Sequence, residues 1–338
     1  MAHLLVLYNA PTLPADHPDT VAELDVLRTA QTIQGYLAEV GHDARLLAIG
    51  DDPSPLVEWL KSEKPAAVFN LFEGLAVMNE TEAAVAGLLE WFGVPFTGCP
   101  ASAMVVCRQK ALAKRLFKGA GLPTADFMLV SDDQLSNPPQ PPSWPVFVKP
   151  ANEDASAGID IGSVVSTHFE LCQRLSYLAR HYRPPFLVET YLEGREFNIG
   201  VIDDPEPLAL PISEIVFSPP AELKDWKPIV TYASKWHTGS AEDLATSPRC
   251  PAEVSPALSD KLCDLALAAY RLTGCRDYAR VDLRTDATGQ PFILEVNPNP
   301  DLSLDAGLAR ALAASGRTHR AFAIKLVERL LQGQAGQR

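Results

Sequence analysis

The sequence has no long apolar run. None of its hydrophobic stretches approaches the roughly 20 residues that a helix needs to cross a bilayer, so neither a membrane-spanning protein nor a membrane partner is expected. The first residues, Met1–Leu7, carry no basic segment and no small-residue cleavage site. A soluble protein with a cytoplasmic location is therefore the expectation.

Two kinds of motif are also missing. The six cysteines are scattered without CxxC spacing, so the sequence predicts neither a zinc site nor a disulfide framework but reduced thiols. No GxGxxG follows the strands expected in the first hundred residues. An NAD-binding function therefore has little support.

Positive charge is scarce. Lysine and arginine number 29 against 42 aspartates and glutamates, which gives a net charge of −13. Nucleic-acid binding requires a field of the opposite sign, so any phosphate site must be local. The densest basic run lies between Arg108 and Lys118, at a spacing that spreads charge along one helix. On spacing alone, a solvated helix face is the favoured interpretation.

The first hundred residues alternate apolar strands with amphipathic helices. The strands are expected at 4–8, 45–49 and 67–71, and the helices at 21–40, 56–61 and 81–92. This alternation predicts a parallel sheet with right-handed crossovers. Ligands of such sheets lie beyond the carboxyl ends of the strands, here at Tyr8–Pro11 and Asn70–Gly74.

The remaining sequence predicts two further α+β units, so the fold class is α/β with three domains at 1–108, 109–190 and 191–338. The second unit has expected helices at 109–119 and 169–180, strands at 146–150 and 186–189, and a small-residue loop at 151–158. The third has expected strands at 196–201 and 208–217, a polar stretch to about 251, a helix at 259–272, two polar-faced strands and a helix at 321–331.

Polar side chains alternate along the two polar-faced strands. Arg280 and Asp282 are two residues apart, as are Glu295 and Asn297, so each pair shares one face of its strand. The turn-like segment 284–291 is long enough to return the chain antiparallel. Carboxylate and amide oxygens suit Mg²⁺, and Arg280 beside them suits an anion. The alternative is an amphipathic hairpin with a solvent-facing polar side.

Other charged residues are candidates for binding a nucleotide. Lys110 and Lys149 offer point charges for phosphates, and the loop 151–158 offers backbone N–H groups. Glu189 and Glu196 could accept hydrogen bonds from a nucleobase amine and a ribose. Surface lysines and salt-bridged surface acids are the alternatives.

Taken in order, these motifs resemble the ATP-grasp superfamily and its D-alanine-D-alanine ligase branch, over roughly residues 65 to 330. The residues that carry the resemblance are Lys110, Lys149-Pro150, Glu189, Glu196, Lys235, Arg280-Val-Asp282 and Glu295-Val-Asn297. It implies an ATP-grasp fold with an N-terminal parallel-sheet domain and two α+β subdomains that enclose ATP. It also implies a homodimer and a ligase in which a small-molecule carboxylate takes the γ-phosphate and an amine then displaces phosphate.

The resemblance implies a role for each matching residue. ATP is expected to contact Lys110, Lys149, Ser156, Glu189, Tyr191, Leu192 and Glu196. Two Mg²⁺ ions, or Mn²⁺ in their place, are expected at Asp282, Glu295 and Asn297. Catalysis is expected to involve Lys235 at the γ-phosphate, Arg280 at the transferred phosphoryl group, and Tyr232 in a small hydrogen-bonded set.

The sequence departs from the family where substrates bind. Tyr8–Pro11 replaces the N-terminal Gly-Gly-x-Ser-x-Glu turn, which leaves Glu23 and Glu73 as loose candidates for the substrate site. Ala155 stands in place of a serine, although Ser156 follows it. After Asn297 the acids Asp301 and Asp305 would repel a carboxylate and attract an amine or guanidinium.

These departures predict an acceptor other than plain D-alanine. A genuine D-alanine-D-alanine ligase and a nucleotide-binding protein without ligase activity are the alternatives.

Overall fold

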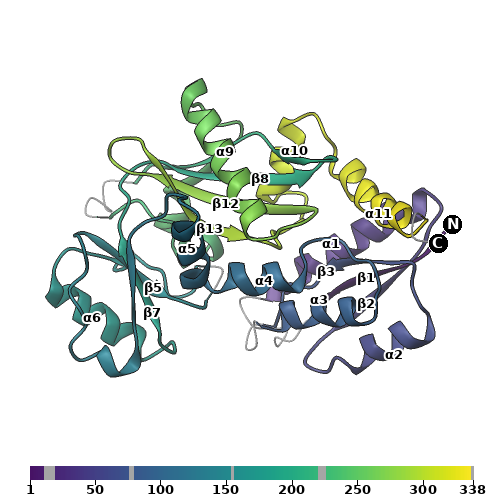
Figure 1. Ribbon diagram of the computed structural model, residues 1–338, viewed down its shortest axis with the longest axis horizontal. Coiled ribbons are helices and arrows are strands. Elements are labelled where there is room, and N and C mark those ends of the chain that lie inside the picture. Colours follow the sequence, from purple (N-terminus) through teal and green to yellow (C-terminus); the bar gives the residue numbers. More distant parts are fainter. Residues whose placement is uncertain (11–19, 76–79, 154–155, 220–225, 336–338) are drawn as a thin grey trace.

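The computed structural model describes residues 1–10, 20–75, 80–153, 156–219 and 226–335, without the side chains of 20–24 and 334–335. Its three sheets follow one another along the long axis of the molecule (Figure 1). Within the described residues, no helix combines the length and the apolar character needed to cross a membrane.

The N-terminal sheet is parallel, in the order β2-β1-β3, which confirms the prediction. Its strands are β1 (His3–Asn9), β2 (Asp43–Ile49) and β3 (Ala67–Leu71), and its helices are α1 (Thr20–Glu39), α2 (Ser54–Ser62) and α3 (Thr81–Trp91). Both faces of β1 are covered: Leu4 and Val6 pack in one core with α1, and Leu5 and Leu7 in another with α2 and α3. A strand buried on both sides has an unbroken apolar sequence.

Two helices connect this sheet to the next. The sequence predicts one helix from Gln109, but the structure has α4 (Ala101–Arg108) and α5 (Lys110–Gly119), separated at Gln109, where ψ is 81°. The basic run is therefore divided between two helices. On α5, Lys110 and Lys114 are buried while Arg115 and Lys118 are exposed, so a wholly solvated helix face is wrong.

The central sheet is antiparallel, in the order β4-β7-β5-β6. Its elements are β4 (Phe127–Val130), the short 3-10 helix η1 (Asp132–Gln134), β5 (Val146–Pro150), β6 (Val164–Val165), α6 (His168–Leu178) and β7 (Phe186–Thr190). Helix α6 begins after Thr167, whose hydroxyl accepts a hydrogen bond from the Glu170 N–H. Leu171 and Leu175 of α6 cover Val146 and Val148 of β5.

The third sheet has six strands, in the order β11-β10-β8-β12-β13 with β9 beside β8. Its elements are β8 (Glu196–Asp203), β9 (Pro207–Ala209), β10 (Ser213–Phe217), α7 (Tyr232–Trp236), α8 (Ala241–Leu244), β11 (Thr246–Arg249), α9 (Pro256–Leu272), β12 (Tyr278–Thr285) and β13 (Pro291–Asn297). The single strand expected at 208–217 is wrong. It divides into β9 and β10 around Pro211, which has no N–H to donate to a ladder.

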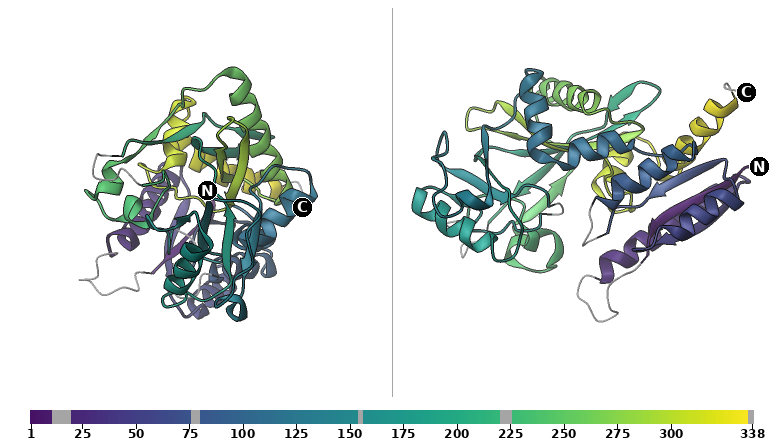
Figure 2. Two further views of the ribbon diagram at one scale, coloured as in Figure 1. Left: turned by 90° about the vertical axis from the view of Figure 1, so that its left-hand side faces the viewer. Right: turned by 60° about the horizontal axis from the view of Figure 1, so that its bottom comes forward.

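The chain then returns to its beginning. Helices α10 (Gly307–Ala314) and α11 (His319–Ala335) bring Leu308, Leu312 and Phe322 into the same core as Leu4 and Val6. Both views of Figure 2 show these helices in yellow, and α11 contacts α1 and β3. The third predicted unit therefore shares a core with the first, and the boundaries at 108/109 and 190/191 stay predictions.

A close approach at Gly194 gives a test of the packing between the β7–β8 connection and the end of β12. A Cβ there would lie 2.1 Å from Thr285 Oγ1 and 2.6 Å from the Thr285 carbonyl oxygen. We expect Gly194→Ala to lower the free energy of unfolding by about 1–3 kcal/mol, as overpacking does, in urea denaturation. The control is Gly35→Ala on the exposed side of α1, where no atom lies within 4 Å; it should be neutral or stabilising by up to about 1 kcal/mol. Equal stability of the two variants would contradict this packing.

Candidate active site

The four polar residues of β12 and β13 face the same way. Arg280 pairs with Asn297 and Asp282 pairs with Glu295 in the antiparallel ladder. Between them, Ala279, Val281 and Leu283 point to the opposite face and are fully buried in the core that includes α9. The predicted arrangement of these residues on one sheet face is confirmed. The alternative, a hairpin with a solvent-facing polar side, is wrong for Asp282, which is buried.

Asp282 is held by two donors. Arg280 donates from Nε to Oδ1 at 2.8 Å and from its terminal nitrogen to Oδ2 at 2.9 Å. Asn198, opposite Asp282 on β8, donates to Oδ1 at 2.7 Å. The sequence alone did not identify Asn198, because nothing in it gives the pairing of β8 with β12. A carboxylate has about four acceptor positions, so Asp282 keeps acceptor capacity for a metal ion.

Glu295 lies among cations from four elements, α5, β5, α7 and β12. Its Oε2 is 4.0 Å from Lys110 Nζ. Burial alone would raise its pKa, but Lys110, Lys149, Lys235 and Arg280 together lower the pKa of Glu295 to about 2. The carboxylate is therefore ionised at neutral pH, and the cations around it form a place where phosphate groups can be neutralised.

A buried ion triad connects α5 with the central sheet. Lys149 Nζ lies 2.9 Å from Glu189 Oε1, and Lys114 Nζ lies 2.7 Å from Glu189 Oε2. All three side chains are buried, so the surface alternatives for Lys149 and Glu189 are wrong. Burial would raise the pKa of Glu189, but the two lysines lower it. Lys114 was missed, although it lies four residues after Lys110 and so on the same face of the helix.

A second buried pair lies further along the same ladder. Arg284 of β12 is opposite Glu196 of β8 and donates to its Oε2 at 2.8 Å. Its other terminal nitrogen donates to Tyr191 Oη at 3.2 Å and to the Pro228 carbonyl at 2.5 Å. Tyr191 and Leu192 are also buried here. Glu196 is therefore salt-bridged but buried, so the alternative of a surface acid is wrong. The sequence alone did not identify its partner Arg284.

Helix α7 carries two of the predicted catalytic residues, Tyr232 and Lys235. Tyr232 donates from its backbone N–H to the Ile159 carbonyl at 2.9 Å, which connects α7 to the loop that contains Ser156. Ser156 has a positive φ of 64°. Partial burial and Arg280 lower the pKa of Lys235, while Glu295 and Asp282 act in the opposite direction. The side chain of Lys235 is therefore near the polar residues of β12 and β13. Ala155 lies outside the described residues.

The opposite wall of the site comes from the N-terminal sheet. Asn9, at the end of β1, accepts a hydrogen bond from the Glu73 N–H at 2.8 Å and donates to the Gly74 carbonyl at 2.5 Å. Asn299 donates from its amide to the Phe72 carbonyl at 3.1 Å, and from its backbone N–H to Asn297 Oδ1 at 3.1 Å. The turn after β3 is therefore connected to Asn297 at the end of β13. The sequence alone did not identify Asn299 or the role of the Asn9 side chain.

Acidic side chains gather where these walls meet. Glu73 is exposed at the surface, yet the density of protein atoms around its carboxyl group, followed by the negative charges of Asp301 and Glu82, raises the pKa of Glu73 to about 8. Asp301 accepts hydrogen bonds from the Ser303 N–H at 2.7 Å and Oγ at 2.8 Å. Burial, then Asp301 and Asp305, raise the pKa of Asp25. The side chain of Glu23 lies outside the described residues.

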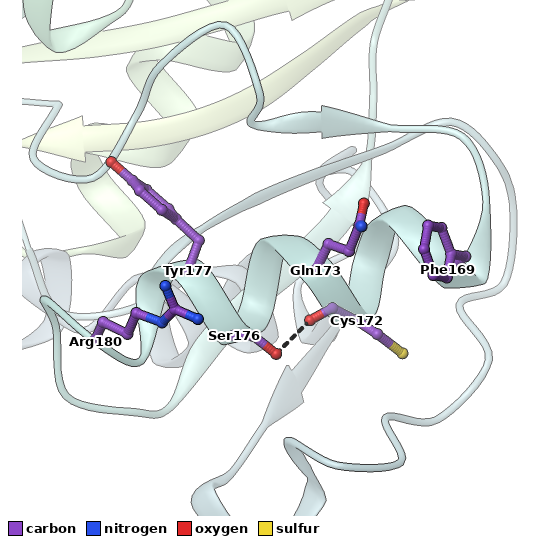
Figure 3. A pocket seen from close by; sticks show the side chains of 6 residues that line it. All are labelled: Phe169, Cys172, Gln173, Ser176, Tyr177 and Arg180. Atoms are coloured by element: carbon purple, nitrogen blue, oxygen red, sulfur yellow. Dashed lines mark hydrogen bonds between the residues drawn. The ribbon is translucent and has the colours of Figure 1, made fainter.

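Two surface hollows lie elsewhere. One is on the outer side of α6, lined by side chains from Phe169 to Arg180 of that helix and the turn after it (Figure 3). The other, of about 350 Å³, lies between the end of β8 and α11. Neither includes a residue of the β12–β13 face.

The donor set suits a hard cation. Asp282, Glu295 and Asn297 offer carboxylate and amide oxygens with no nitrogen or sulfur ligand among them. Among the described residues, no group of three or more His, Cys, Asp or Glu side chains could by itself hold a metal ion. Two carboxylates and an amide fit Mg²⁺, which is commonly shared between protein oxygens, phosphates and water.

Comparison with known proteins identifies a family. The family model described as D-ala D-ala ligase C-terminus matches residues 116–332, which is more than half of the chain. The chain belongs to the D-alanine-D-alanine ligase family. Membership confirms the resemblance seen in the sequence.

Individual family relatives match most of the chain. The uncharacterized protein y4sG of Sinorhizobium fredii is 32% identical over 86% of this chain and 84% of its own. The D-alanine--D-alanine ligase of Gluconobacter oxydans is 31% identical over 83% of this chain and 86% of its own.

Solved structures show the same fold. The D-alanine--D-alanine ligase of Bacillus anthracis complexed with ATP superposes with a TM-score of 0.73 at 19% identity, over 100% of both chains. The VanG D-Ala:D-Ser ligase of Enterococcus faecalis gives 0.73 at 17% identity, over 97% of this chain and 99% of its own. The expected ATP-grasp fold, with one parallel sheet and two antiparallel sheets, is confirmed.

The Lys114–Glu189 pair predicts a pH-dependent stability difference. Because the lysines hold the pKa of Glu189 below 4.5, their pairing stabilises the fold above that pH, and this contribution is lost as the pH falls through the lowered value. We expect Lys114→Met to lower the free energy of unfolding by about 3 kcal/mol at neutral pH, and by less at pH 4.

The matched control for Lys114→Met is Lys118→Met, on the same helix. Lys118 forms an exposed pair with Asp126, and its loss should cost at most about 1 kcal/mol. Urea denaturation of both variants at the two pH values gives the measurement. Equal losses for Lys114→Met and Lys118→Met would contradict a buried, charged triad.

Proposed function

We propose that the protein is an ATP-dependent ligase that joins a carboxylate to an amine through an acyl phosphate. The observation that carries the proposal is the β12–β13 face, where Asp282, Glu295 and Asn297 lie beside Arg280 and within the influence of lysines from α5, β5 and α7. This arrangement combines ligands for a hard cation with a cluster of cations for phosphates. The names of the relatives support the same class of reaction.

In this proposal each group has a separate task. Lys110 and Lys149 bind the phosphates of ATP, and Lys235 reaches the γ-phosphate from α7. Asp282, Glu295 and Asn297 hold two Mg²⁺ ions, which neutralise phosphate charge when bound. Arg280 stabilises the phosphoryl group during transfer and the tetrahedral centre that follows.

The remaining residues bind the nucleotide and position the substrates. Tyr191 and Leu192 contact the adenine base of ATP, and Glu196 binds its ribose. Glu189 holds Lys149 in place through their ion pair. Ser156 belongs to the phosphate loop, and Tyr232 lies where α7 meets that loop. The cytoplasmic location, the homodimer and the use of Mn²⁺ stay predictions.

The reaction is tested by mass spectrometry of the products formed from ATP, Mg²⁺ and a pool of D- and L-amino acids, polyamines and guanidino compounds. We expect an amide product and ADP, and a hydroxamate when hydroxylamine replaces the amine. Asp282→Asn and Glu295→Gln should each reduce turnover at least about 100-fold, since each removes charge that stabilises the transition state. Asp264→Asn, on the exposed side of α9, should have no effect. Near-normal turnover in either site variant would overturn the metal assignment.

We further propose that the acceptor carries an additional positive charge, in contrast to D-alanine. Asp301 is near enough to Glu73 and to Arg280 to raise the pKa of each, and Asp305 lies with Asp301 near Asp25. Acids at this place attract an amine or guanidinium and repel a carboxylate. Formation of D-alanyl-D-alanine at a rate comparable to that of polyamine or guanidino products would contradict this. The names of the relatives favour a second candidate function, a D-alanine-D-alanine ligase.

Glu73 makes the acceptor preference depend on pH. A carboxyl group with a pKa of about 8 gains its charge as the pH rises through that value. For a guanidino acceptor, which stays charged, kcat/KM should therefore rise between pH 7 and pH 9. In Glu73→Gln we expect kcat/KM to rise less steeply, because only the deprotonation of the attacking amine then contributes, and to be about tenfold lower at pH 9, the size of a lost charge-assisted hydrogen bond. Glu58→Gln, exposed on α2, is the control. An unchanged slope in Glu73→Gln would exclude Glu73 from acceptor binding.

A further inference from the structure

Arg284 continues the row of polar residues on β12. Arg280, Asp282 and Arg284 lie opposite Gly200, Asn198 and Glu196 of β8 without interruption. Arg284 is only 4% exposed. A guanidinium is strongly charged and expensive to bury, so a residue of this kind beside the proposed nucleotide site requires a physical explanation.

The contacts of Arg284 leave part of its hydrogen-bonding capacity unused. Its terminal nitrogens donate to Glu196, Tyr191 Oη and the Pro228 carbonyl. Its Nε is buried and has no hydrogen-bond partner among the described residues. The guanidinium also lies 5.1 Å from the centre of the Tyr191 ring and 5.6 Å from that of Phe217. Arg284 is therefore fixed by an aromatic and polar enclosure.

The bond to Glu196 fixes only one of its two carboxylate oxygens. Arg284 donates to Oε2, and within the described part of the chain the structure shows no hydrogen bond to Oε1. Burial raises the pKa of Glu196, and Arg284 is the strongest influence in the opposite direction. Removing Arg284 would therefore both release the carboxylate and favour its neutral form.

We propose that Arg284 is a positioning residue for nucleotide recognition, which holds Glu196 so that its second oxygen accepts a hydrogen bond from a ribose hydroxyl. The inference rests on the proposed ATP site. It assigns to Arg284 a role that reaches the nucleotide through Glu196. The variant should therefore change the discrimination between ribose and deoxyribose more than the overall affinity for phosphates.

The test measures equilibrium binding of ATP, 2′-deoxyATP and 3′-deoxyATP to the full chain with Mg²⁺, by calorimetry. For the wild type we expect at least one deoxy analogue to bind about tenfold or more weakly than ATP, as loss of a hydrogen bond to a charged group predicts. In Arg284→Met the ratio of the two dissociation constants, deoxy analogue over ATP, should fall below about threefold. Arg271→Met, exposed in the last turn of α9, should keep the wild-type ratio.

Two further variants separate positioning from folding. Arg284→Lys keeps the charge without the planar fork and should give an intermediate ratio. In the Glu196→Gln background, adding Arg284→Met should cause no further loss of discrimination between ATP and its deoxy analogues. Both side chains of this double variant are neutral, so neither leaves a buried charge without a partner. A wild-type ratio in Arg284→Met or Arg284→Lys, or a further loss in the Glu196→Gln background, would overturn the inference. Wild-type protein that binds no ATP would overturn the proposed ATP site itself.

Discussion

The site depends on a concentration of cations around buried carboxylates. The chain carries a net charge of −13, yet Lys110, Lys114, Lys149 and Arg284 are all buried. Burying charges costs more than their mutual attraction commonly returns, so these pairs are poor candidates for devices that only stabilise the fold. Their positions along α5, β5 and β12 concentrate positive charge at one face of a protein whose overall field would repel phosphate.

The sequence reveals those features that depend on local periodicity. The placement of Arg280, Asp282, Glu295 and Asn297 on one face follows from the two-residue repeat of a strand, and the structure agrees. Local periodicity does not predict which residues are partners across the sheet, because the register of β8 against β12 is a tertiary property. Asn198 could not be identified for that reason. Arg284 continues the two-residue repeat after Asp282, but the predicted turn at 284–291 includes it, whereas the structure places it in β12. The division of residues 208–217 was within reach of the sequence, since Pro211 cannot donate to a ladder.

Burial was the second property that the sequence left open. Lys149, Glu189 and Glu196 were equally consistent with surface residues until their partners were known. A lysine at the end of a strand is commonly exposed, and only the crossing of α5 over the central sheet brings Lys114 to Glu189. The same tertiary contact explains why a helix rich in lysine has two of them on its apolar side.

The C-terminal helices hold the β12–β13 face against the N-terminal sheet. Helices α10 and α11 share a core with β1 and β3, so the segment after Asn297 is fixed against the N-terminal sheet. Asn299 then bonds both Asn297 and the turn that precedes Glu73. Two hydrogen bonds of Asn299 therefore connect that turn to Asn297 on the β12–β13 face. The acidic residues near this turn, Glu73 and Asp301, lie outside the β12–β13 face. The acceptor preference proposed for them can therefore vary without any change on that face.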